Sequence, residues 1–185
     1  YYDPATGHML YGLQKIDGKT YYFAPGSGAR FGGQIKIDGN WYLFNKKTGV
    51  MQTGFQYIAS QKKTVYYDPA TGHMLYGLQK INGKTYYFAP GSGARVVGQI
   101  KINGKWYMFD KKTGVMQTGF RYIASQKKTV YYSPKTGHML YGLQKINGKW
   151  YMFDKRSGAK ISYQTVGTYI RLKHNAALYS AKGKK

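Results

Sequence analysis

Residues 12–23 read GLQKIDGKTYYF, and this stretch decides the fold. Its centre, Asp17-Gly18, separates two short segments in which apolar and polar residues alternate. An Asp-Gly or Asn-Gly pair supplies the two positive-φ residues of a type I′ turn, so the stretch predicts a β-hairpin. Tight turns are also predicted at Asp38-Gly39, Asn82-Gly83, Asn103-Gly104 and Asn147-Gly148, and longer turns at Ala59–Lys63 and Ala124–Lys128. Together these turns predict seven consecutive hairpins.

The hairpins belong to an internal repeat. Residues 1–65 and 66–130 match at 57 of 65 positions, and a third copy begins at residue 131. A loop glycine recurs at intervals of 21, 21 and 23 residues, at Gly7, Gly28, Gly49, Gly72, Gly93, Gly114, Gly137 and Gly158. A lone hairpin is only marginally stable in water, so these units must stack on their neighbours. We therefore expect an all-β solenoid of consecutive hairpins, with about three hairpins per superhelical turn.

Composition limits the class of protein. The chain has 185 residues, a net charge of +23, no cysteine and 17% aromatic residues. No apolar run is long enough to span a membrane, and the first residues recur inside the sequence, so we expect a fragment of a larger secreted protein. The solenoid is predicted over residues 1–161. Residues 162–185 are predicted to form a separate basic segment, with a short strand near 168–172 and a poorly ordered tail.

The sequence offers little for catalysis. Its six acidic residues are all aspartates, placed at turns and strand ends, and no pair is positioned for acid–base chemistry. His8, His73 and His138 recur 65 residues apart without acidic neighbours, which favours packing in loops over metal binding. We predict no enzymatic activity, no metal site and no cofactor.

The repeated pattern Gly-x5-Gly-x-x-Tyr-Tyr-Phe-x4-Gly resembles the cell-wall-binding and glucan-binding repeats of Gram-positive surface proteins. These include the choline-binding modules of autolysins and the glucan-binding domains of glucansucrases. The resemblance covers residues 1 to about 160 and implies a hairpin solenoid that holds a sugar or wall polymer and tethers an enzyme or adhesin. Residues 169–184 resemble the start of the wall-binding domains of lactobacillar surface-layer proteins, which also implies a cell-surface location.

Within this family, choline-binding repeats carry a tryptophan after the first glycine of each hairpin. No tryptophan stands at the corresponding positions, which are Leu13, Gln34, Phe55, Leu78, Gln99, Phe120 and Leu143. Because a choline cage depends on aromatic walls, this departure argues against choline. Two hairpins instead contain Gln-x-Lys, at Gln34 and Lys36 and at Gln99 and Lys101, which resembles the glucan-pocket motif of glucansucrase repeats.

Strand alternation adds candidate aromatic platforms. Residues i and i+2 of a strand face the same way, so the amide and ammonium of Gln-x-Lys are expected to project side by side. The residues expected on the packed face are Tyr21, Phe23, Tyr42, Phe44, Tyr86, Phe88, Tyr107 and Phe109. The opposite face is expected to present Tyr22, Trp41, Tyr87, Trp106 and Trp150 as platforms for sugar rings. Trp41 and Trp106 share a hairpin with Gln-x-Lys, which predicts two pockets one turn apart.

The sequence therefore favours a non-catalytic carbohydrate-binding module that binds α-glucan and tethers a secreted protein to the bacterial envelope. The charge of +23 supports an alternative, an electrostatic anchor for teichoic acid or another anionic wall polymer. A rigid stalk is a third interpretation. Nucleic acid would bind such a chain only nonspecifically, since no groove-reading element is present.

Overall fold

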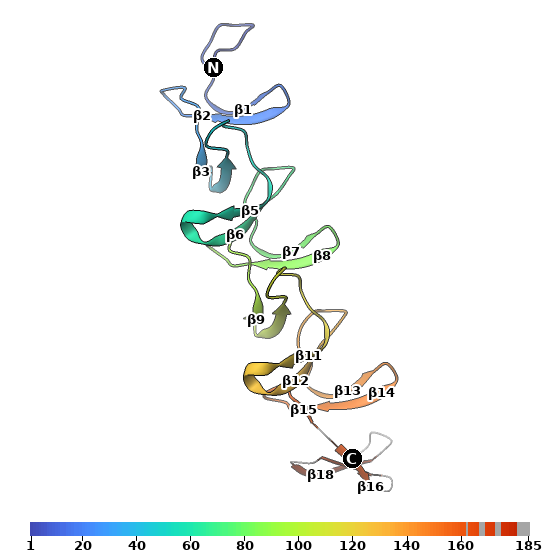
Figure 1. The fold of residues 1–185 in the computed structure, drawn as a ribbon. Coiled ribbons are helices and arrows are strands. Elements are labelled where there is room, and N and C mark those ends of the chain that lie inside the picture. Colours follow the sequence, from blue (N-terminus) through green and yellow to red (C-terminus); the bar gives the residue numbers. More distant parts are fainter. Residues whose placement is uncertain (162, 167–168, 173–174, 181–185) are drawn as a thin grey trace. The chain divides into compact units, whose positions relative to one another are not determined.

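The computed structural model describes residues 1–161, 163–166, 169–172 and 175–180, and the chain is all-β (Figure 1). Seven antiparallel hairpins follow one another, as the turn residues predict. They are β1 (Gly12–Ile16) with β2 (Lys19–Phe23), β3 (Gly33–Ile37) with β4 (Asn40–Phe44), β5 (Gly54–Ile58) with β6 (Lys63–Tyr67), β7 (Gly77–Ile81) with β8 (Lys84–Phe88), β9 (Gly98–Ile102) with β10 (Lys105–Phe109), β11 (Gly119–Ile123) with β12 (Lys128–Tyr132), and β13 (Gly142–Ile146) with β14 (Lys149–Phe153).

The turns have the predicted backbone conformation. Asp17 and Gly18 have φ values of 49° and 73°, the left-handed pair that a type I′ turn requires. In the two longer turns a 3₁₀ segment, η1 (Ala59–Gln61) or η2 (Ala124–Gln126), is followed by a left-handed lysine. These two short helices are the only ones in the described residues, and neither could cross a membrane.

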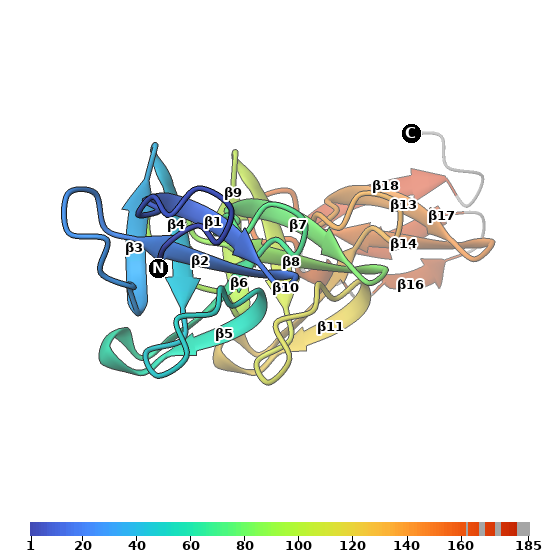
Figure 2. The same cartoon turned by 90° about the horizontal axis from the view of Figure 1, so that it is seen from above.

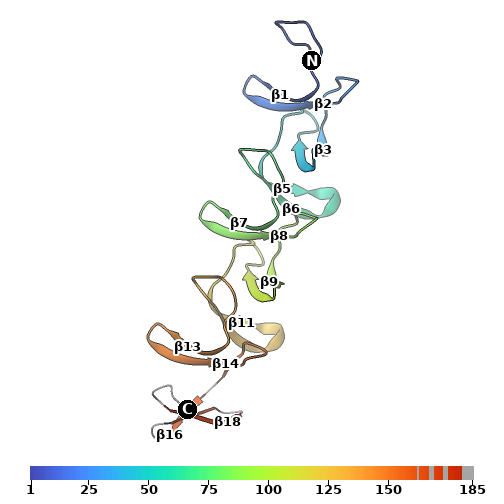
Figure 3. The same cartoon turned by 180° about the vertical axis from the view of Figure 1, so that it is seen from behind.

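The chain divides into two compact units, residues 1–96 and 97–185. The first contains the four hairpins from β1 to β8, and the second contains the three from β9 to β14. Within the first unit the β7–β8 hairpin points in the same direction as β1–β2, as Figures 1, 2 and 3 all show. Because two hairpins lie between them, the first unit makes one turn in three hairpins.

Loops between hairpins hold neighbouring modules together. In the loop after β6, the Met74 backbone N–H donates to the Trp41 carbonyl of β4 at 2.9 Å. In the same loop Gly72 has a φ of 77°, and a Cβ there would lie 2.5 Å from the Met51 sulfur of the preceding loop. The regular loop glycine is therefore required both by its left-handed backbone and by the side chain packed against it.

Side chains are buried on both faces of most hairpins, which corrects the expectation of one packed and one open face. Tyr86, Tyr87 and Phe88 are consecutive in β8 and are all at most 8% exposed. The reason is that a hairpin in a stack has a neighbour on each side. Among the described residues, the buried side chains accordingly form several small clusters between successive hairpins.

The end of the chain contains more strand than the sequence analysis predicted. Strand β15 (Lys160–Ile161) pairs with β14, and β16 (Tyr163–Val166), β17 (Tyr169–Leu172) and β18 (Asn175–Ser180) form a separate antiparallel sheet. Strand β17 overlaps the one strand that was predicted. The tail predicted to be poorly ordered begins after residue 172, and strand β18 lies within it, so that prediction was wrong for residues 175–180. Residues 173–174 and 181–185 of the predicted tail lie outside the described residues.

Candidate functional site

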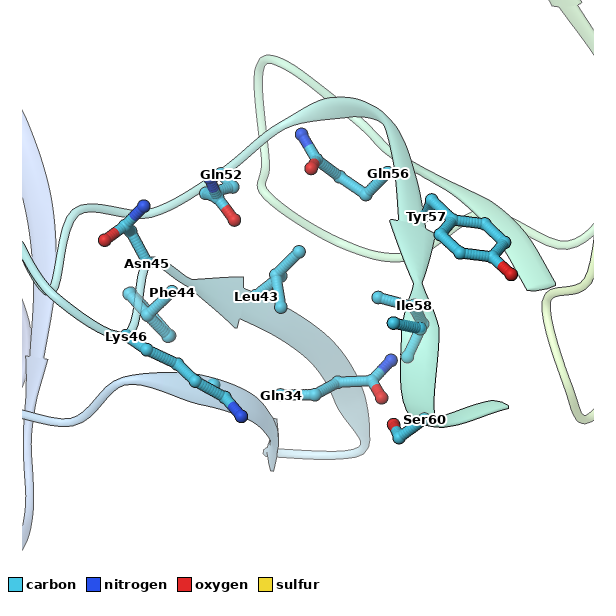
Figure 4. Close-up of a pocket in the computed structure, with 12 residues that line it drawn as sticks. Gln34, Leu43, Phe44, Asn45, Lys46, Gln52, Gln56, Tyr57, Ile58 and Ser60 are labelled. Atoms are coloured by element: carbon cyan, nitrogen blue, oxygen red, sulfur yellow. The ribbon is translucent and has the colours of Figure 1, made fainter. Parts of the chain in front are cut away.

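A pocket of about 360 Å³ lies in the first unit, between the β3–β4 hairpin and strand β5. Figure 4 shows that Leu43 and Ile58 extend toward each other across it, whereas the Tyr57 side chain points away. The backbone alternation explains this difference, since successive side chains of β5 lie on opposite faces. Together with Phe44, Leu43 and Ile58 give the pocket an apolar lining.

Polar side chains surround this apolar lining. Asn45, Gln52 and Gln56 contribute carboxamides and Lys46 contributes an ammonium group (Figure 4). Gln56 Nε2 donates to the Thr53 carbonyl at 2.8 Å, which leaves its oxygen for a ligand. Asn45 Oδ1 accepts two backbone N–H bonds of its own loop, which leaves its amide nitrogen. The pocket thus combines an apolar surface with hydrogen-bond donors and acceptors that carry no net negative charge.

Gln34, a predicted site residue, lines the pocket, but its amide makes a bond within the fold. Its Nε2 donates to the Tyr67 hydroxyl of the next hairpin at 2.8 Å, and its Oε1 accepts a longer bond from Gln61 at 3.4 Å. Burial raises the pKa of Tyr67, and the bond from Gln34 partly offsets that rise. In the second copy Gln99 donates to Tyr132 in the same way at 2.8 Å.

The lysine and the tryptophan of each predicted Gln-x-Lys pocket have surroundings that differ from those of the glutamine amide. Lys36 and Lys101 are exposed and lie directly across their hairpins from Trp41 and Trp106. Trp41 is half-buried and packs on the cluster that includes Val65, and Trp106 packs on the equivalent cluster of the second copy. The amide of Gln34 is therefore turned into the fold while the ammonium of Lys36 reaches solvent. These tryptophans contribute to the packing between hairpins.

The remaining predicted platforms differ in exposure. Tyr22 is buried and contacts Phe31 and Phe44, and Tyr87 is also buried. Trp150 is 41% exposed, and the ammonium of its cross-strand partner Lys145 lies 5.8 Å from its ring centroid. Of the five predicted platforms, Trp150 is the most exposed.

The residues at the corresponding positions of the second copy differ in type and in hydrogen bonding. Asp110 replaces Asn45 and Arg121 replaces Gln56. Gln117 Nε2 donates to Asp110 Oδ2 at 3.0 Å, and Arg121 donates to the Phe120 carbonyl at 2.9 Å. The Gln117 amide nitrogen is thus bonded within the second copy, whereas no such bond is made by the equivalent Gln52 of the first.

Two clusters of three rings were not predicted from the sequence. In the first unit Phe55 lies 4.8 Å from Tyr66 and 5.1 Å from Tyr86, measured between ring centroids. In the second unit Phe120 lies at the same distances from Tyr131 and Tyr151. The signal was present, since phenylalanine follows Gly54 and Gly119 at the position where choline-binding repeats carry tryptophan.

The histidines and carboxylates have structural contacts. His73 Nε2 lies 2.7 Å from the Tyr42 hydroxyl, which joins the loop after β6 to strand β4. In the described part of the chain, no three histidine or acidic side chains come together as metal ligands. Asp68 accepts hydrogen bonds from the backbone N–H groups of its own loop, and these bonds lower its pKa.

Family models match most of the repeats. A choline-binding repeat model matches residues 31–76 and 75–120, and a cell wall binding repeat model matches residues 12–29 and 142–158. No curated protein sequence matches the chain.

Solved structures from Streptococcus pneumoniae share the fold. CbpJ is 27% identical with a TM-score of 0.80, and the match covers 99% of this chain and 60% of CbpJ. Choline binding protein F, solved in the presence of a peptidoglycan analogue, is 31% identical with a TM-score of 0.67, over 86% of this chain and 55% of that one. The modular autolysin LytC, in complex with a synthetic peptidoglycan ligand, is 19% identical with a TM-score of 0.64, over all of this chain and 45% of LytC, and shows the fold alone. The chain therefore spans about half to three fifths of the length of these proteins.

Proposed function

Since this chain belongs to the choline-binding, cell-wall-binding repeat family, we propose that it attaches a larger secreted protein to the bacterial cell envelope. The family consists of binding modules, and the chain acts here by holding a polymer and not by catalysis. Each site on such a repeat is weak, and several sites on one solenoid raise the overall avidity through effective concentration.

The ligand we propose is a neutral polysaccharide, with α-glucan as the representative. The observation that carries this proposal is the pocket between β3–β4 and β5. Its apolar lining of Leu43 and Ile58 suits the C–H face of a sugar ring, and the amides of Asn45, Gln52 and Gln56 suit the hydroxyls. Ligand sites commonly combine an apolar concave surface with a few polar groups that determine orientation.

The test is dextran retention in affinity electrophoresis of the whole chain. Gln52 lines the pocket, and its side chain has no hydrogen-bond partner among the described residues, so Gln52→Ala should reduce retention without lowering stability. The matched control is Gln117→Ala at the same position of the second copy, where the amide is already bonded to Asp110. Retention that is equal in both variants, or that is absent from the wild-type chain, would contradict the proposal.

The Gln-x-Lys prediction requires its own variants. Replacing Gln34 or Gln99 would also break a bond to a buried tyrosine, so loss of binding would not distinguish a contact with sugar from a folding defect. Lys36→Ala and Lys101→Ala are cleaner because both ammonium groups are exposed. A drop in dextran retention in these two variants would support the prediction that the lysines contact the ligand.

The net charge of +23 supports a second candidate, an electrostatic anchor for teichoic acid. Such binding should collapse as salt rises from about 0.1 M to about 0.5 M, because exposed charges are screened over shorter distances at higher ionic strength. Sugar binding in the amide pocket should change little over that range. Sedimentation with walls that retain or lack teichoic acid separates the two candidates, since only the anchor needs the anionic polymer.

A further inference from the structure

Two residues of the second copy place charged groups where the first copy has neutral amides. Asn45 and Gln56 line the pocket of the first unit, and Asp110 and Arg121 hold the same positions 65 residues later. The two copies fold alike at this place, because β9–β10 and β11 have the same lengths and strand register as β3–β4 and β5. The second unit therefore carries two opposite charges where the first carries two amides.

The Arg121 guanidinium has donors that the fold does not use. Successive side chains of β11 alternate between its faces, so Arg121 lies on the same face as Ile123, as Gln56 does with Ile58 in the first unit. Arg121 Nη1 donates to the Phe120 carbonyl at 2.9 Å, whereas its Nε is buried and has no hydrogen-bond partner among the described residues. A buried, unbonded N–H of a charged group is costly, so this one calls for an acceptor from outside the chain.

Asp110 supplies an acceptor at the same site. Its Oδ1 accepts the backbone N–H groups of Lys112 and Thr113, and these loop bonds lower its pKa. Its Oδ2 accepts the Gln117 amide at 3.0 Å. A carboxylate oxygen has more than one acceptor position, so Oδ2 can also accept a hydroxyl of a ligand. In the part of the chain that the structure describes, no hydrogen bond or ion pair joins Asp110 to Arg121.

An apolar surface accompanies the two charges. Met108 and Ile123 hold the positions of Leu43 and Ile58, which line the pocket of the first unit, and they pack in one cluster. Such a surface suits the C–H face of a sugar ring, and a glycerol phosphate chain has no ring to place there. The arrangement therefore favours a saccharide over a phosphate polymer as the source of the anion.

We propose that Arg121 and Asp110 form a binding site for an acidic sugar such as a hexuronic acid, in which Arg121 holds the carboxylate and Asp110 accepts a hydroxyl. The Nε and Nη2 edge of a guanidinium matches the two oxygens of a carboxylate, which gives a bidentate contact. This inference goes beyond the proposed function, since it concerns the second unit and an acidic ligand. The amide pocket of the first unit takes a neutral one.

The test compares two substitutions that each remove one positive charge and install the residue of the first copy. Arg121→Gln removes the guanidinium, and Lys105→Asn alters an exposed lysine beside the turn of β9–β10. Trigalacturonate is titrated into the whole chain while the arginine Nε–Hε signals are followed by NMR. The salt concentration is about 0.5 M, at which screening weakens the general attraction of the net charge.

Arg121→Gln should weaken trigalacturonate binding at least about tenfold, because a bidentate charged contact is lost. Lys105→Asn should weaken it less than about twofold, as expected for an exposed charge. In the wild-type chain the ligand should shift the Arg121 Hε signal downfield, since a new hydrogen bond forms there. Equal losses in the two variants, or an Arg121 signal that does not respond, would overturn the proposal.

Two further measurements separate the alternatives. Poly(glycerol phosphate) is the second probe, and a loss of its binding in Arg121→Gln as large as that of trigalacturonate would overturn the assignment to a sugar carboxylate. Asn45→Asp combined with Gln56→Arg transfers both charges to the first unit and should add one trigalacturonate site, and an unchanged number of sites would contradict the proposal. Dextran retention tests the amide pocket and should be the same in Arg121→Gln as in the wild-type chain, so the two proposals can fail separately.

Discussion

The side-chain amide of Gln34 donates a 2.8 Å hydrogen bond to the hydroxyl of Tyr67, and these residues lie in successive hairpins, 33 positions apart. The second copy repeats the bond between Gln99 and Tyr132 at the same distance. Tyr67 and Tyr132 are fully buried, so each bond satisfies a hydroxyl that water does not reach. The glutamine that the sequence marks as a sugar ligand therefore also holds two modules together.

A double-mutant cycle should measure this bond. Gln34→Ala leaves the buried Tyr67 hydroxyl without its partner and should lower the free energy of unfolding by about 1–3 kcal/mol. With Tyr67→Phe already present, the same change should cost clearly less, because no hydroxyl remains to be satisfied. Urea titration followed by circular dichroism gives the four values. Additive effects in the cycle would show that the bond contributes no coupling.

Loop glycines should be far more sensitive to substitution than turn glycines. At Gly72 a methyl group would meet the Met51 sulfur at 2.5 Å in addition to adopting a left-handed backbone, so Gly72→Ala should cost about 2–4 kcal/mol. Gly83 has a similar φ of 75° but open space around its Cβ position, so Gly83→Ala should cost only about 1 kcal/mol. The comparison is made by urea unfolding, and equal losses would refute the packing argument.

Acidification should affect the loops that contain aspartate. Backbone N–H bonds, chiefly from Thr113, lower the pKa of Asp110 below its ordinary value of 3.8. A carboxyl whose pKa is lower in the folded state stabilises the fold above its unfolded pKa, and that stability is lost as the pH falls through the folded value. Stability should therefore decline below about pH 4.

Asp110→Asn is the matched variant for this prediction, because the first copy carries Asn45 at the same position and Asn45 makes the same two loop bonds. The variant should lose less stability than the wild-type chain between about pH 4 and pH 2, measured as the shift of the urea midpoint. Identical pH profiles of the two proteins would count against a contribution from the Asp110 charge.

Tryptophan accessibility should follow the packing between hairpins. Trp150 is 41% exposed, whereas Trp41 and Trp106 are half-buried against neighbouring hairpins. Acrylamide should therefore quench the fluorescence of Trp150 most strongly, and Trp150→Phe should remove most of the readily quenched emission. If Trp41→Phe removed as much of this emission as Trp150→Phe, Trp41 would be an open platform after all.

The local sequence was sufficient for the hairpins. Asp17-Gly18 and the equivalent pairs adopt the positive φ values that their side chains permit, and this preference acts over two residues without help from the rest of the chain. The glycine period likewise predicts stacked modules, because every module repeats the same apolar strands. Seven hairpins and one turn per three hairpins in the first unit followed from these two features.

Only the tertiary structure decided which groups are available to a ligand. Alternation assigns Tyr22 and Trp41 to the face opposite the core, but a stacked hairpin has a neighbour on both sides, so that face is covered as well. The hydrogen bond from the Gln34 amide to Tyr67 and the position of the Lys160 ammonium over the Phe120 ring both depend on packing between modules. These contacts join residues far apart in sequence, which no local pattern of side chains can specify.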